Sequence, residues 1–311
     1  MHYSPQPLHI PDGFLSLIVS LICWVITAVT ISVAVSRTNK SLGEKQVPLM
    51  GVMAAFIFAA QMINFPVAGG TSGHLLGGAL AAIMLGPWAG MLVMTAVIAV
   101  QGLLFQDGGL LVMGANILNM GLITCVIGYG LYRSVSNGNR MLKLVVAGIA
   151  AWLSVMAGAL FTSLQLWLSG TSQLQVVIPA MLFVHALIGL GEAVITVAAL
   201  SFVLQARPDL LGENSDSAKG SKGWIIVGVA VSLIVVFLSP FASSDPDGLE
   251  RVAGDLGFLQ AGRSAPFSII PDYAVPFFGE APLSTIIAGI MGLAVVGGII
   301  ALIGQGMKAK S

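Results

Sequence analysis

Four histidines are the side chains of this chain best suited to hold a metal ion: His2, His9, His74 and His185. Imidazole nitrogen suits nickel, cobalt, copper and zinc. The topology derived below places the first three on the outer face of a membrane. Histidines on one water-facing side are a weak signal alone, because they also cap helix ends or lie among lipid headgroups.

The second position of the chain adds a sharper possibility. A histidine there can chelate an ion through the α-amine, its own backbone nitrogen and its Nδ1, and His2 meets this requirement. A second imidazole would complete a planar set of nitrogens, which favours Ni(II) or Cu(II). The amide must lose its proton to bind, which disfavours calcium and magnesium.

The elements that must position these residues follow from composition. Of the 311 residues, 57% are apolar and 8% are charged, whereas soluble domains carry about 25% charged residues. Residues 46–106 and 144–191 contain no Lys, Arg, Asp or Glu. A helix of about 20 apolar residues spans a bilayer core, and only a helix satisfies its own backbone in lipid. The sequence therefore predicts an all-α polytopic membrane protein, and its zero net charge gives no sign of a nucleic-acid partner.

We predict nine transmembrane helices, near residues 14–36, 47–64, 73–86, 89–105, 112–132, 144–168, 176–205, 224–240 and 283–306. Gly86-Pro87-Trp88 should form the turn between the short third and fourth helices, since proline is costly inside a helix. Basic residues set the orientation. With the N-terminus outside and the C-terminus inside, all Lys and Arg residues fall inside except Arg251 and Arg263.

A polar, flexible stretch divides the chain into two modules. Residues 1–207 form the predicted seven-helix metal-binding module, and residues 208–223 form a cytoplasmic linker rich in Ser, Gly and Asn. Residues 224–311 form a two-helix module. Its extracytoplasmic loop, 241–282, contains six acidic and two basic residues.

Polar residues inside the predicted helices have two interpretations. His185 and Glu192 are seven residues apart and share one helix face, and ionisable groups within a membrane are functional candidates. An interhelical polar network is the favoured interpretation, because amide side chains lie in other predicted helices. These are Gln61, Gln101, Asn116 and Asn119.

Two acidic residues and one pair of alanines complete the candidates. Asp107 precedes two glycines, which is typical of a turn, although it could help attract cations. Asp12 is predicted to cap the first helix. Ala55 and Ala59 are four residues apart in the second helix, where small residues let helices approach closely. They could pack inside the chain or meet a partner.

Several segments point to a family when taken together: His9-Ile10-Pro11-Asp12-Gly13-Phe14-Leu15, Gly70-Thr71-Ser72-Gly73-His74-Leu75-Leu76-Gly77-Gly78, Leu85-Gly86-Pro87-Trp88-Ala89, Gln106-Asp107-Gly108-Gly109, Gly114-Ala115-Asn116 and His185-Ala186-Leu187-Ile188-Gly189-Leu190-Gly191-Glu192-Ala193. Over residues 8 to about 205 the chain resembles the substrate-binding subunit of nickel/cobalt energy-coupling-factor (ECF) importers. The second module resembles their small PDGLE-type accessory subunit, through Pro246-Asp247-Gly248-Leu249-Glu250, Gly257-Phe258 and Pro271-Asp272-Tyr273. The chain resembles a fusion of the two.

The resemblance implies metal ligands at an N-terminal Met-His pair and a later histidine, which match Leu8, His9 and His74. In the family the first histidine is the second residue, so we hypothesise that this chain starts at Leu8, through a leucine-type codon read as Met. If Met1 is the true start, Met1 and His2 would chelate instead. The residues expected around the ligands, or in the polar network, are Asp12, Asp107, Asn116, His185 and Glu192.

The resemblance also implies a transport subunit without a cofactor of its own, and not an enzyme. It would capture Ni²⁺ or Co²⁺ at the extracytoplasmic face of a bacterial cytoplasmic (inner) membrane. A membrane coupling subunit, which the Ala55 and Ala59 surface would contact, and two cytoplasmic ATPases would then drive import. The chain itself contains neither GxxxxGK[ST] nor HExxH. The alternative is a stand-alone secondary permease, with ligands on broken helices at mid-membrane.

The start hypothesis predicts the mass of the native protein. When the gene is expressed with its own start signals, the intact mass should correspond to a chain whose first residue is a Met at position 8. The purified protein should also contain one equivalent of nickel or cobalt. A protein that retains residues 1–7 would contradict the start at Leu8 and leave chelation to Met1 and His2.

Overall fold

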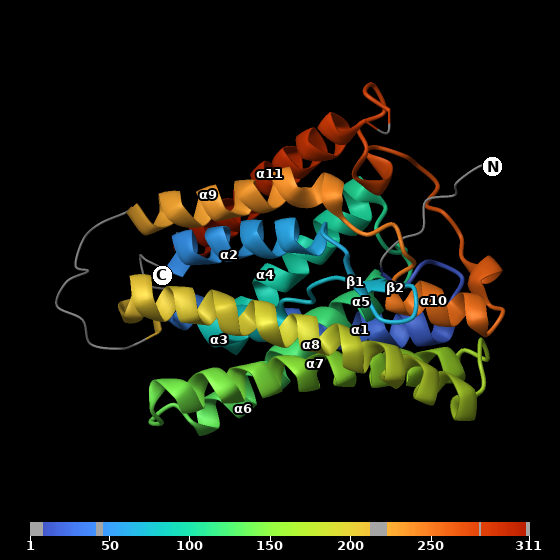
Figure 1. The fold of residues 1–311 in the computed structure, drawn as a ribbon, viewed down its shortest axis with the longest axis horizontal. Coiled ribbons are helices and arrows are strands. Elements are labelled where there is room, and N and C mark those ends of the chain that lie inside the picture. Colours follow the sequence, from blue (N-terminus) through green and yellow to red (C-terminus); the bar gives the residue numbers. More distant parts are fainter. Residues whose placement is uncertain (1–8, 42–45, 212–222, 280, 309–311) are drawn as a thin grey trace.

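The computed structural model describes residues 9–41, 46–211, 223–279 and 281–308. It is a bundle of helices with one short two-stranded hairpin (Figure 1). The elements in chain order are α1 (Leu17–Ser41), α2 (Gln46–Gln61), β1 (Phe65–Val67), β2 (Thr71–Gly73), α3 (Gly78–Leu85), α4 (Pro87–Val100), the π-helical turn η1 (Gln101–Phe105), α5 (Met113–Asn116), the π-helical segment η2 (Ile117–Ile123), α6 (Thr124–Ser134), α7 (Arg140–Leu168), α8 (Leu174–Ala206), α9 (Gly223–Leu238), α10 (Gly248–Asp255), the 3₁₀ turn η7 (Pro271–Tyr273) and α11 (Pro282–Lys308).

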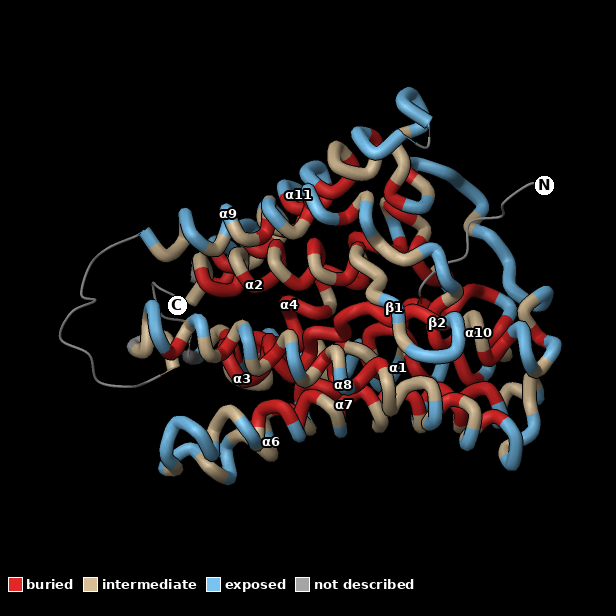
Figure 2. Tube along the Cα trace, viewed as in Figure 1, coloured by how far each residue is buried: buried red, intermediate tan, exposed pale blue. Residues whose placement is uncertain are grey.

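The helices differ in how deeply they are buried (Figure 2). Every residue of α3 is buried, and so are most residues of α4. Helices α1 and α9 instead present large apolar side chains outward, such as Ile18 and Ile226, which are 72% and 73% exposed. An apolar outer surface of this extent marks contact with lipid or protein rather than with water.

Seven segments of the described chain are long and apolar enough to cross a membrane: Leu17–Lys40, Pro87–Phe105, Met113–Ser134, Arg140–Leu168, Leu174–Ala206, Gly223–Phe241 and Pro282–Met307. This finding confirms the predicted class, a mostly helical multi-pass membrane protein. It does not confirm nine spans, because α2 has 16 residues and α3 has only 8. At about 1.5 Å per residue, α3 is roughly 12 Å long.

The helix predicted over residues 73–86 starts later than expected. Strand β2 is followed by residues 74–77, which form no regular secondary structure, and Gly77 turns the chain into α3 with a φ of 82°, a conformation that glycine adopts readily. Glu192 of α8 stabilises this turn by accepting hydrogen bonds from the backbone N–H groups of Leu76 and Gly77, at 2.6 and 2.9 Å. The third predicted helix is therefore a non-helical segment followed by a short helix.

The predicted turn between α3 and α4 is present. Gly86 has a φ of 81°, and Pro87 is the first residue of α4. Proline suits this position because the first N–H groups of a helix have no partner within the helix.

Helix α2 packs against α4 and against both long helices of the second module, α9 and α11 (Figure 1). Glycine allows α11 to come close to α2, because a Cβ on Gly292 would collide with the ring of Phe58. Ala55 and Ala59 are 8% and 0% exposed, so in this arrangement they pack inside the chain. A partner could contact them only if their neighbours moved. The predicted linker 208–223 lies largely outside the described residues, so the module boundaries stay a prediction.

Residues 241–282, which we call the accessory loop, are joined to the first module by backbone hydrogen bonds. The N–H of Ser243 donates to the carbonyl of Asn64 at 2.8 Å, and Ser72 donates to Pro246, also at 2.8 Å. Further along, Arg263 donates to Asp12 at 2.7 Å, and Ile270 donates to Leu104 at 3.0 Å. The loop is therefore bound to four separate segments of the first module.

Helix α10 of the accessory loop begins with a buried carboxyl group. Asp247 is 5% exposed, and its side chain accepts a hydrogen bond from the N–H of Glu250 at 2.8 Å. Burial raises the pKa of Asp247 from 3.8 to about 8, and the nearby charges of Glu250 and Asp107 act in the same direction. Asp247 is therefore protonated in the folded protein at neutral pH.

This shift predicts a pH-dependent stability with a definite sign. Between pH 3.8 and about 8, the folded chain holds a proton on Asp247 that the unfolded chain has lost, so the free energy of unfolding should fall as pH rises through this window. Asn caps helices as well as Asp but carries no such proton. Asp247→Asn should therefore flatten the slope of the thermal unfolding midpoint against pH, measured in detergent. An unchanged slope would show that Asp247 titrates alike in both states.

Candidate metal centre

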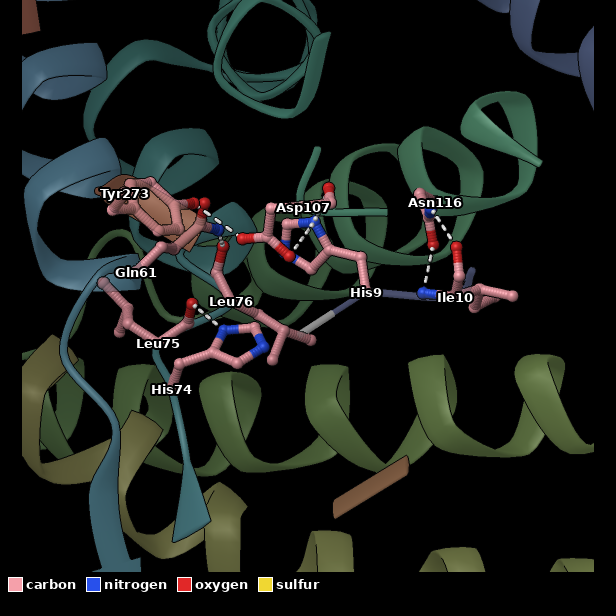
Figure 3. Close-up of polar contacts among 9 residues, drawn as sticks. All are labelled: His9, Ile10, Gln61, His74, Leu75, Leu76, Asp107, Asn116 and Tyr273. Atoms are coloured by element: carbon pink, nitrogen blue, oxygen red, sulfur yellow. Dashed lines mark hydrogen bonds and ion pairs between the residues drawn. The ribbon is translucent and has the colours of Figure 1, made fainter. Parts of the chain in front are cut away.

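Two histidines from distant parts of the chain lie side by side. His9 belongs to the segment before α1, and His74 follows strand β2 directly. Their ring centroids are 5.4 Å apart with an angle of 65° between the planes (Figure 3). Both residues are almost fully buried, at 2% and 6% exposure.

The position of His9 is fixed by Asn116 at the end of α5. The Asn116 side chain accepts a hydrogen bond from the N–H of Ile10 at 3.1 Å and donates one to the carbonyl of Ile10 at 3.0 Å (Figure 3). The N–H of Gly109 donates to the same carbonyl at 2.9 Å. Asn116, which the sequence placed near the ligands or in a polar network, thus holds the segment that carries His9.

Hydrogen bonds also define which ring nitrogens carry protons. Nδ1 of His9 lies 3.1 Å from the carbonyl oxygen of Asp107, and Nδ1 of His74 lies 3.0 Å from that of Leu75. A carbonyl oxygen can only accept, so Nδ1 is the donor in both rings. In the neutral form of each ring, the lone pair that could bind a metal is then on Nε2. Nε2 of His9 is buried and has no hydrogen-bond partner among the described residues.

This arrangement differs from the chelate expected from the sequence. A three-nitrogen chelate uses Nδ1 of the first histidine, whereas Nδ1 of His9 is bonded to Asp107. The ring of His9 would have to turn for that chelate to form. The other predicted ligands, Met1, His2 and Leu8, lie outside the described residues.

The separation of the two rings suits a shared ion. With metal–nitrogen bonds of about 2.0 Å, two imidazoles on one ion have centroids roughly 4.5 to 6.4 Å apart for bond angles between about 90° and 180°. The 5.4 Å between the centroids of His9 and His74 falls within this interval. No group of three His, Cys, Asp or Glu side chains that could hold an ion is found within residues 9–41, 46–211, 223–279 and 281–308. At this position the described side chains therefore offer two imidazoles and no third ligand of these types.

Asp107 lies behind the ring of His9 and links it to the second module. Its Oδ1 is 3.6 Å from Nδ1 of His9. Its Oδ2 accepts a hydrogen bond from the hydroxyl of Tyr273 at 2.6 Å (Figure 3). The residue is 4% exposed, so its charge is poorly screened and favours a cation nearby. Tyr273 was part of the Pro271-Asp272-Tyr273 motif, but nothing in the sequence indicated that it bonds to the carboxylate beside His9.

Asp12 does not cap the first helix, and that prediction is wrong. Its carboxylate accepts hydrogen bonds from the N–H groups of Leu110, Leu111 and Val112, at 3.0, 2.9 and 3.2 Å. Those amides lead into α5, about a hundred residues away. At α1, the Ser16 hydroxyl instead accepts from the N–H of Val19 at 3.4 Å.

His185 and Glu192 have separate roles despite sharing a helix. Glu192 binds the turn before α3, as described above, and so fixes the chain just after His74. Nδ1 of His185 donates to the carbonyl of Met181 at 2.8 Å, and its ring faces Gly248, where a Cβ would lie 2.9 Å from its Cε1. Gly248 belongs to α10, so His185 contacts the accessory loop.

The predicted interhelical polar contacts are partly present. The side-chain amides of Asn119 and Gln165 exchange two hydrogen bonds, at 2.7 and 2.8 Å, and Asn119 also donates to Thr162 at 3.1 Å. Gln61 donates to the carbonyl of Leu76 at 2.7 Å, which adds to the bonds of Glu192 in fixing the segment after His74. Both sides of the histidine pair are thus supported by buried polar side chains from other helices.

The class to which this chain belongs, the substrate-specific proteins of metal uptake, follows from comparison with known protein families. Residues 9–210 match the family described as the cobalt uptake substrate-specific transmembrane region, and residues 221–309 match the PDGLE domain. The chain belongs to the first family and carries the second domain fused to it.

Similar proteins have the same fused architecture. The chain is 36% identical to a putative fused nickel transport protein of Archaeoglobus fulgidus, over 93% of this chain and 95% of that protein. It is 26% identical to a fused nickel transport protein of Rhodobacter capsulatus, also over 93% and 95%. The crystal structure of a truncated transition metal transporter is 36% identical, with a TM-score of 0.58 over 63% of this chain and 98% of that one. These similarities confirm the resemblance to nickel/cobalt transport proteins.

The geometry predicts that Asp12 acts on folding and not as a ligand. Asp12→Ala leaves three backbone N–H groups without their acceptor, which should lower the free energy of unfolding by about 2–5 kcal/mol. Asp12→Asn retains one carbonyl oxygen and should lower it less. Thermal unfolding in detergent measures this effect, and the metal affinity of the protein that remains folded should change less than about tenfold. Full stability combined with lost metal binding would instead make Asp12 a ligand.

Proposed function

We propose that this protein captures Ni²⁺ or Co²⁺ at the extracytoplasmic face of the cytoplasmic membrane, as the substrate-specific component of an ATP-driven ECF-type importer. The observation that carries the proposal is the buried pair of His9 and His74, each with Nδ1 on a backbone carbonyl. Metal-binding histidines usually donate their other ring nitrogen in this way, which orients the ring for the ion.

The donor set supports a transition metal. Two imidazoles suit nickel, cobalt, copper or zinc, whereas calcium and magnesium prefer sets of oxygen ligands. If the chain starts at Leu8, its α-amine adjoins His9 and supplies a further nitrogen. If it starts at Met1, the Met1–His2 pair is the alternative source. Because every nitrogen must be deprotonated to bind, affinity should fall as pH falls.

The distribution of charge supports the orientation. The C-terminal ends of α1 and α8 and the turn between α6 and α7 lie at one end of the bundle, and the accessory loop lies at the other (Figure 1). The first end carries Lys40, Arg133, Arg140 and Arg207. Cytoplasmic segments are rich in Lys and Arg, so the histidine pair, on the side of the accessory loop, faces outward in this proposal.

ATP hydrolysis would fall to partner proteins, since the sequence has no GxxxxGK[ST] loop. We propose that a membrane coupling subunit and a pair of cytoplasmic ATPases act with this chain. Metal uptake that continued in cells without those ATPases would favour a stand-alone permease instead.

The test of the site compares single histidine variants. His74→Ala and His9→Ala should each weaken Ni²⁺ binding by more than about 100-fold, because each removes a proposed ligand. His185→Gln is the matched control, since His185 bonds to Met181 and contacts Gly248 instead. Calorimetric titration of the purified full chain measures all three.

Equal affinity in His74→Ala and in the native chain would refute the site. Adding His2→Ala to the series separates the two possible starts. A loss of binding in His2→Ala would show that Met1 and His2 chelate the ion, and unchanged binding would support the start at Leu8.

A further inference from the structure

The second module extends one side chain into the surroundings of the proposed metal site. The hydroxyl of Tyr273 donates a hydrogen bond to Oδ2 of Asp107 at 2.6 Å. Asp107 in turn faces Nδ1 of His9 with its backbone carbonyl, at 3.1 Å, and with Oδ1, at 3.6 Å. Tyr273, Asp107 and His9 thus form a continuous chain of contacts from the accessory loop to a proposed ligand (Figure 3).

The backbone around Tyr273 is held in an unusual conformation. Asp272 and Tyr273 both have a positive φ, 53° and 55°, which is uncommon for residues other than glycine and is rarer still for a bulky side chain. Conformations of this kind persist where the surrounding structure holds them in place, and they concentrate at functional sites. Here the N–H of Ile270 is fixed on the carbonyl of Leu104 at 3.0 Å.

The ring of Tyr273 packs against two aromatic side chains of the first module. It stacks on Phe105 with centroids 4.7 Å apart and 16° between the planes, and it packs against Phe58 at 6.1 Å. Only 8% of the residue is exposed. Burial, together with the charge of Asp107, raises the pKa of Tyr273 well above its ordinary value. The hydroxyl therefore keeps its proton and remains a donor.

The segment on the other side of the contact also departs from regular structure. Gln106 has a φ of 57°, and the N–H of Asp107 bonds to the carbonyl of Gln101 at the start of η1, at 3.1 Å. Asp107 thus follows a helix end and precedes two glycines. A hydrogen bond that orients its side chain can therefore also set the direction of its carbonyl group.

We propose that Tyr273 is a positioning residue for metal capture, which orients Asp107 and through it the imidazole of His9. This inference rests on the proposed function, in which His9 binds the ion. It gives the accessory loop a defined contribution to metal affinity through one hydroxyl group.

The test removes the hydroxyl and keeps the ring. Tyr273→Phe in the full-length chain preserves the stacking on Phe105 and should weaken Ni²⁺ binding about tenfold, which corresponds to about 1.4 kcal/mol. The metal-free variant should still fold, with a thermal unfolding midpoint moderately below that of the native chain, because one buried hydrogen bond is lost. Tyr129→Phe is the matched control, because it also loses a hydroxyl group, which accepts a hydrogen bond from Arg133 at 2.6 Å, and it should bind Ni²⁺ like the native chain.

A double variant shows whether the effect passes through Asp107. In Asp107→Ala the backbone carbonyl remains but the acceptor of the Tyr273 hydroxyl is gone, so adding Tyr273→Phe should change the affinity no further. Unchanged affinity in Tyr273→Phe alone would overturn the inference. The same tenfold loss in the Asp107→Ala background would overturn it too.

The Ni²⁺ affinities of His74→Ala and Tyr273→Phe distinguish an error in the proposed metal site from an error in the role of Tyr273. If His74→Ala binds Ni²⁺ as tightly as the native chain, the proposed metal site is wrong. If His74→Ala abolishes binding while Tyr273→Phe binds normally, only the role of Tyr273 is wrong.

Discussion

Backbone groups outside helices need partners, and around the histidine pair this need is met by buried polar side chains. A chain embedded in lipid tolerates irregular backbone only where protein satisfies its N–H and C=O groups. Asp12 accepts hydrogen bonds from the three amides before α5. Asn116 accepts one from the N–H of Ile10, and Glu192 accepts two from the turn before α3. Each of these side chains comes from a segment far from the backbone it binds. Their hydrogen bonds bring the segments of His9 and His74 together, and the proposed site depends on them.

The class of fold and the two histidines could be predicted from sequence, because long apolar stretches and specific motifs are local features. The length of α3, the partner of Asp12 and the role of Tyr273 could not. Asp12 and the amides it binds are about a hundred residues apart, and Tyr273 and Asp107 are 166 residues apart. A local sequence pattern does not indicate which distant segment will contact a given side chain. The nitrogen of His9 that faces Asp107 is likewise a product of three-dimensional arrangement.

The two modules share one apolar core in this structure. Helix α2 of the first module packs against α9 and α11 of the second, and residues of all three belong to the same cluster of buried apolar side chains. At the accessory loop the interface between the modules includes polar contacts. The loop forms backbone hydrogen bonds with Asn64, Ser72, Asp12 and Leu104. Covalent fusion thus accompanies an extensive interface, which reaches from the membrane-spanning helices to the surroundings of the histidine pair.

The near-complete burial of both histidine rings has a consequence for the kinetics of exchange. At 2% and 6% exposure, neither ring can meet a hydrated ion until the segments that cover it move apart. The association rate is then limited by the frequency of that opening and not by diffusion, and the same barrier must be crossed when the ion leaves. An ion bound at the proposed site would accordingly have a long residence time even if its equilibrium affinity were moderate. Such slow release would suit a carrier that must hold its cargo until a partner opens the site.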